Sequence, residues 1–67
     1  MKVNRLKAAM LIKDISAQEL AEKMGISYVT LIKKMNGDTQ FKLDEMRQIS
    51  ELLEIGEPEV IDIFFND

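Results

Sequence analysis

The chain has 67 residues and a mass of 7.7 kDa, which is enough for one small hydrophobic core. It contains no Cys and no His, so disulfide bonds, thiolate chemistry, the usual zinc sites and catalysis by a histidine base are excluded. No apolar run approaches the roughly 20 residues that a membrane-spanning helix needs, and no signal-peptide core follows the basic N-terminus. We therefore expect one soluble, cytoplasmic domain over residues 1–67, without a metal or cofactor.

The net charge of −3 hides an uneven distribution along the chain. Residues 1–36 hold seven basic and three acidic side chains, a sum of +4, whereas residues 37–67 hold two basic and nine acidic ones, a sum of −7. Local charge rather than net charge decides which partner a surface attracts. The basic first half therefore indicates an anionic partner, despite the negative total.

Two helices are expected in the first 25 residues. The first lies near residues 5–13, with Asn4 as a candidate N-cap. The second begins after a capping box, in which Ser16 and Glu19 satisfy each other's backbone N–H groups, and ends at Gly25, where a left-handed conformation favours glycine. The residues at helical spacing on the apolar faces of these two helices are Leu6, Ala9, Met10, Leu20, Ala21 and Met24.

A third helix is expected over residues 28–36. Ser27 is its candidate N-cap, which makes the connection from the second helix very short, and the run Asn36-Gly37-Asp38 ends it. The wheel places Tyr28, Leu31, Ile32 and Met35 on the apolar side, and Val29, Thr30, Lys33 and Lys34 on the other.

Two more helices complete an all-α prediction of five helices and no strand. The fourth, near residues 43–54, is expected to end at Gly56, and Pro58 fits the first position of a short fifth helix. The expected apolar residues are Leu43, Met46, Ile49 and Leu53 in the fourth helix, and Val60, Ile61, Phe64 and Phe65 in the fifth. Because so short a helix cannot bury all its apolar residues, we expect one of Phe64 and Phe65 to pack inward and the other to contact a second protein.

The second and third helices have the features of a helix-turn-helix unit. Ala21 is small where the helices cross, Gly25 makes the turn, and apolar residues fill the space between them. The segment SAQELAEKMGISYVTLIKKMNG resembles the lambda-repressor-like and Cro-like helix-turn-helix proteins of phages and bacteria, and QFKLDEMRQISELLEI is similar to their fourth helix. The ending EPEVIDIFFND resembles prophage-encoded regulators of Gram-positive bacteria.

This resemblance implies a compact five-helix lambda-repressor-like DNA-binding domain, whose third helix lies in the major groove of operator DNA. Carried over by position, the candidate DNA contacts are Ser27, Tyr28, Val29, Thr30, Lys33, Lys34 and Asn36. Ser27 and Asn36 are expected to meet phosphates, and Lys34 to contact DNA alike in all sequences. The expected base readers are Tyr28, Val29, Thr30 and Lys33. From the residues alone, Tyr28 fits core packing nearly as well as base contact, and Asn36 fits simple helix termination as well as phosphate contact.

Two positions depart from the family pattern. Lys34 stands where the family usually has an apolar residue, so we expect Met35 to take over that packing. Met10 and Met35 stand where many members pair an Arg with a Glu, so a thioether contact replaces the ion pair in our interpretation.

The expected function is that of a sequence-specific transcriptional regulator of the repressor type, and not that of an enzyme. It is expected to act as a homodimer on double-stranded operator DNA, since one recognition helix reads only a few base pairs. Phe64 or Phe65 is the expected dimer contact. The alternative is an antirepressor-like interaction module, in which the acidic C-terminal half grips a partner regulator.

Overall fold

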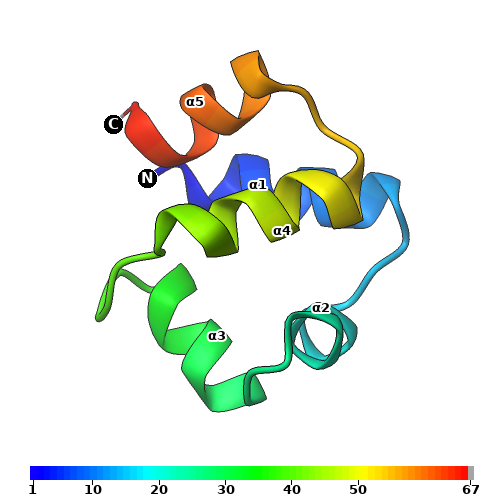
Figure 1. The fold of residues 1–67 in the computed structure, drawn as a ribbon, viewed down its shortest axis with the longest axis vertical. Helices are drawn as coiled ribbons and strands as arrows, with labels where there is room; N and C mark the ends of the chain where they lie inside the picture. Colours follow the sequence, from blue (N-terminus) through cyan, green and yellow to red (C-terminus); the bar gives the residue numbers. More distant parts are fainter. Residues whose placement is uncertain (67) are drawn as a thin grey trace.

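The computed structural model describes residues 1–66, which form five α-helices and no strand. The helices are α1 (Val3–Ile12), α2 (Ala17–Met24), α3 (Tyr28–Met35), α4 (Leu43–Leu53) and α5 (Glu57–Phe65). In Figure 1, α4 crosses the middle of the view, α5 lies above it, and α2 and α3 lie below it. α2 packs against α3 and α4, and α5 packs against α1 and α4. The prediction of an all-α, five-helix fold is confirmed.

One hydrophobic core joins all five helices. Its centre consists of large aliphatic side chains that are almost completely buried, and each helix contributes at least one of them. These are Leu6, Leu20, Leu31, Ile49, Leu53 and Ile63. Since every helix buries a residue in the same cluster, the position of each helix depends on the others.

The start of α1 differs from the prediction. The helix begins at Val3, so Asn4 lies inside its first turn and is not the N-cap. Lys2 occupies the cap position without a side-chain cap, and its carbonyl oxygen accepts from the N–H of Arg5 at 3.1 Å. The N–H of Lys2 donates to the carbonyl oxygen of Ile63 at 2.8 Å, which joins the start of α1 to α5.

The connection between α4 and α5 also differs. Glu54, rather than Gly56, ends α4 in a left-handed conformation with φ of +54°, and Gly56 is instead the N-cap of α5. The end of α4 is held by Ser50, whose hydroxyl donates to the carbonyl oxygen of Ile55 at 2.8 Å. Pro58 lies at the second helical position, one residue later than predicted.

Leu43, an apolar residue predicted to face the core, points outward. Leu43 is 75% exposed, although Ile49 and Leu53 of the same helix are buried. Six residues separate Leu43 from Ile49, which is about 120° around a helix, so the two side chains cannot share a face. The inward position at the start of α4 belongs to Glu45 instead.

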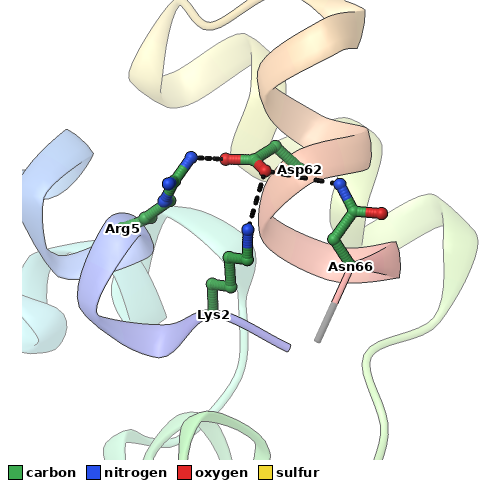
Figure 2. Close-up of polar contacts among 4 residues, drawn as sticks. All are labelled: Lys2, Arg5, Asp62 and Asn66. Atoms are coloured by element: carbon green, nitrogen blue, oxygen red, sulfur yellow. Dashed lines mark hydrogen bonds and ion pairs between the residues drawn. The ribbon is translucent and has the colours of Figure 1, made fainter.

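A cluster of polar side chains joins α1 to α5. The carboxylate of Asp62 accepts from the Nζ of Lys2 at 3.1 Å and from the guanidinium of Arg5, and Asn66 Nδ2 donates to it at 3.3 Å (Figure 2). The hydrogen bond from Lys2, aided by those from Asn66 and Arg5, lowers the pKa of Asp62 below its usual 3.8. The cluster therefore stabilises the fold only while Asp62 is ionised.

We predict that this cluster makes stability depend on acidity. Because the folded-state pKa of Asp62 is lowered, its contribution is fully present above the unfolded value of 3.8 and is lost as the pH falls through the folded value. Asp62→Asn should lower the melting temperature at pH 7, and the difference from wild type should shrink below pH 3.8. Thermal unfolding followed by circular dichroism checks this. A difference that stays constant from pH 7 to pH 2 would contradict the assignment.

Candidate nucleic-acid interface

The turn between α2 and α3 has the local structure that the sequence predicts. Ser16 Oγ accepts from the N–H of Glu19 at 3.1 Å, and Ser16 N–H donates back to Glu19 Oε1 at 3.2 Å, so the capping box is confirmed. Gly25 has a φ of +74°, the left-handed conformation in which an L side chain is strained. Ile26 N–H then donates to the carbonyl of Ala21 at 3.0 Å. These bonds determine the direction in which the chain enters α3.

The N-terminus of α3 is organised by two hydroxyl groups. Ser27 Oγ accepts from the N–H of Thr30 at 3.0 Å and donates to Thr30 Oγ1 at 2.8 Å, which confirms Ser27 as the N-cap. Both residues are exposed. Because the N-terminus of a helix carries partial positive charge and free N–H groups, this end of α3 suits a phosphate oxygen.

The outer face of α3 is open to solvent along its length. Tyr28 is 51% exposed and Val29 is 61% exposed, so Tyr28 does not pack in the core. Thr30, Lys33 and Asn36 are exposed as well. Asn36 also ends the helix, since its N–H makes the last helical bond, to the carbonyl of Ile32 at 2.9 Å. The structure thus places six of the seven predicted contact residues on the accessible side of α3 or at its ends.

Lys34 is the exception, and its predicted outward orientation is wrong. Its side chain is only 8% exposed, and its Nζ donates to the carbonyl of Gln40 at 3.2 Å and lies 3.1 Å from Glu45 Oε1. The cause is helical spacing: Lys34 follows the buried Leu31 by three residues, about 60° around the helix, whereas Lys33 points away from Leu31. Lys34 takes part in the interior of the fold, beside the buried Met35.

Glu45, the partner of Lys34, is buried, and the sequence analysis did not predict its burial. A signal for it exists: Glu45 precedes the buried Ile49 by four residues and so lies on the same face of α4. A lysine and a glutamate on the inward faces of consecutive helices indicate a buried ion pair. Treating every charged residue as solvated conceals this pattern.

In the folded protein, ion pairs join the basic first half of the chain to the acidic second half. Four of the seven basic side chains of residues 1–36 form ion pairs, and each of their carboxylate partners comes from the acidic half. Lys2 and Arg5 pair with Asp62, Lys13 with Glu54, and Lys34 with Glu45. Within residues 1–66, the basic side chains of the first half that form no ion pair are Lys7, Lys23 and Lys33. Lys33 is therefore the unpaired cation of α3.

A family model described as helix-turn-helix matches residues 6–60, which is most of the chain. The fold and the α2–α3 unit define a helix-turn-helix domain of the kind found in DNA-binding transcriptional regulators. The chain belongs to the helix-turn-helix family of lambda repressor and Cro. No curated protein and no solved structure matches the chain closely enough to narrow this further. None of the helices described within residues 1–66 is long and apolar enough to cross a membrane.

Proposed function

We propose that the chain is a sequence-specific repressor that occupies operator DNA as a homodimer, with α3 in the major groove. The observation that carries the proposal is the exposed outer face of α3, which presents Tyr28, Val29, Thr30 and Lys33 on a helix of a DNA-binding family. Occupied operator DNA is inaccessible to RNA polymerase, so repression by steric exclusion is the simplest mechanism.

The proposed contacts have distinct chemistry. Lys33 donates to guanine O6 or N7, Thr30 bonds to a base edge, and Val29 meets the methyl group of thymine. Ser27 and Asn36, at the two ends of the helix, are assigned to phosphates, which set the position of the helix in the groove. Since the set has no Arg or Gln to make a bidentate base contact, each half-site should discriminate only moderately. Two half-sites are then needed for a useful specificity.

The proposed dimer contact is an apolar patch on α5. Ile61 and Phe65 are separated by four residues and therefore share a face, and they are 45% and 58% exposed. Phe64 instead packs edge-on against Phe41, with 5.2 Å between ring centroids. Exposed apolar patches commonly mark interfaces. Of the two phenylalanines, Phe65 is thus assigned to the subunit contact and Phe64 to the interior.

The test of this function starts from random DNA duplexes, from which the wild-type protein selects its preferred sequence. Fluorescence anisotropy then compares that duplex with a scrambled one across a salt series. The logarithm of the affinity should fall linearly with the logarithm of the salt concentration, and the selected duplex should bind more tightly at every salt concentration. Failure to enrich any sequence would refute sequence-specific binding, and absence of a salt slope would favour the alternative, an antirepressor-like module that binds another regulator.

We predict that Lys33 contributes to base discrimination. Lys33→Ala should weaken binding to the selected duplex by about 1–3 kcal/mol, and should weaken binding to scrambled DNA much less. Lys7→Ala is the matched control: it also removes one unpaired surface cation, but from α1 rather than from α3. Equal losses of affinity for the two duplexes would mean that Lys33 contacts a phosphate rather than a base.

We also predict that Phe65 holds the dimer together. Phe65→Ala should shift the protein toward monomer in sedimentation at micromolar concentration, because truncation removes much of the exposed apolar area of the patch. Leu43→Ala is the control, since Leu43 is also exposed but lies on α4. A wild-type protein that is monomeric both alone and on its operator would contradict the homodimer.

A further inference from the structure

A buried ion pair connects the end of α3 to the start of α4. Lys34 Nζ lies 3.1 Å from Glu45 Oε1 and donates to the backbone carbonyl of Gln40 at 3.2 Å. The same Glu45 oxygen accepts from the backbone N–H of Lys42 at 2.8 Å. The two side chains therefore bind two points of the segment 36–42 as well as each other. Both are largely excluded from solvent.

The position of α3 depends on few other directional contacts. Among the helices, α2 is the one against which α3 packs most extensively. Leu31 and Met35 supply apolar contacts, which hold α3 against the core but are nondirectional. The hydrogen-bonded pair of Lys34 and Glu45 is directional and has one favourable geometry. It therefore adds a directional constraint on the rotation of the last turn of α3, which also carries Lys33.

We propose that the Lys34–Glu45 pair is a positioning device that sets the orientation of α3 and thereby the sequence specificity of DNA binding. The proposal rests on the function proposed above, because it concerns the helix assigned to read DNA. Lys34 and Glu45 themselves touch no base. They act through the backbone that carries Lys33 and Asn36 to the DNA.

Energetics separate this role from a purely stabilising one. The cost of removing two charges from water largely offsets their attraction, so replacing a buried ion pair with apolar side chains is often neutral for stability or even stabilising. Such a replacement nevertheless removes the hydrogen bonds that constrain the orientation of α3. A variant without the pair should therefore remain folded while α3 becomes less well oriented.

The test variant is Lys34→Met/Glu45→Met, which removes both charges and leaves the net charge unchanged. Long-range attraction to DNA is thus preserved, and any effect must come from geometry or packing. The matched control is Lys13→Met/Glu54→Met, which removes an ion pair with the same change in chemistry from the ends of α1 and α4. Both variants are compared with wild type on the duplex that wild type selects and on a scrambled duplex.

We expect the Lys34→Met/Glu45→Met variant to lose at least tenfold in affinity for the selected duplex and less than twofold for the scrambled one. The control should change by less than twofold on both. If Lys34→Met/Glu45→Met does not fold, as judged by circular dichroism, Lys34→Gln/Glu45→Gln replaces it. That variant keeps polar groups at both sites but cannot span the same distance, and the same tenfold loss is expected.

The outcomes distinguish this inference from the proposed function. If wild type enriches no sequence, the proposed function fails before any variant is measured. The specificity of each protein is the ratio of its affinities for the selected and the scrambled duplex. If wild type is specific and a folded variant without the ion pair keeps this ratio within twofold of the wild-type value, the positioning role is overturned. An equal loss of affinity on both duplexes also overturns it, since that result reflects a general defect rather than a change in reading.

Discussion

Replacement of Leu31 with Ala is expected to lower the free energy of unfolding by about 2–5 kcal/mol, because the substitution leaves a cavity where the side chain is completely buried. Small domains have total stabilities of about 5–15 kcal/mol or less, so a large part of the population should unfold. Urea denaturation followed by circular dichroism measures the loss. Leu31 lies on α3, so loss of the core contact also releases the helix assigned to DNA.

The control for this experiment is Val29→Ala, two residues away on the same helix. Val29 is 61% exposed, so its truncation should change the stability by no more than about 0.5 kcal/mol. The pair of variants thus separates the buried face of α3 from its outer face. A Leu31→Ala protein as stable as wild type would mean that the helix is rotated relative to this structure.

The second large effect is expected when one partner of the buried ion pair is removed. Lys34→Met leaves the carboxylate of Glu45 buried without its cation, which should cost about 3–5 kcal/mol. The double variant Lys34→Met/Glu45→Met should recover most of that loss, since it leaves no uncompensated charge. Urea denaturation of the two single variants and the double variant gives the coupling energy directly.

The pair of Lys13 and Glu54, whose side chains are 32% and 70% exposed, provides the comparison. Because Glu54 is mostly exposed, water compensates for the loss of its partner, and Lys13→Met should cost about 1 kcal/mol or less. If Lys34→Met is as mild as Lys13→Met, the carboxylate of Glu45 has found water or another partner. The buried pair would then not be the constraint described above.

Short-range patterns predicted the helix-turn-helix well. The capping box of Ser16 and Glu19, the left-handed Gly25 and the N-cap Ser27 each involve residues close in sequence, so the residue types alone carry the information. The site residues on the outer face of α3 follow from the same spacing. The outward placement of Val29, Thr30 and Lys33 required no knowledge of the rest of the fold.

Two of the errors lie where another part of the chain decides. α1 begins two residues earlier than a cap at Asn4 would place it, and its start is joined to α5 by the bond from Lys2 N–H to the carbonyl of Ile63, a contact that no local pattern reports. A lysine is usually exposed, and the burial of Lys34 becomes favourable only through Glu45 and Gln40. The error at Leu43 is different, because the spacing within α4 already excludes Leu43 from the buried face of Ile49, and the apolar character of the residue alone misleads.

The contact between α1 and α5 has a consequence for the order of folding. Lys2 and Asp62 are 60 residues apart in sequence, so the ion pair between them closes nearly the whole chain into a loop. During synthesis, α2 and α3 emerge together and can associate early, whereas α1 has no α5 to bind until α5 has left the ribosome. The contact between α1 and α5 is therefore among the last contacts of the domain to form, although α1 is made before the other four helices.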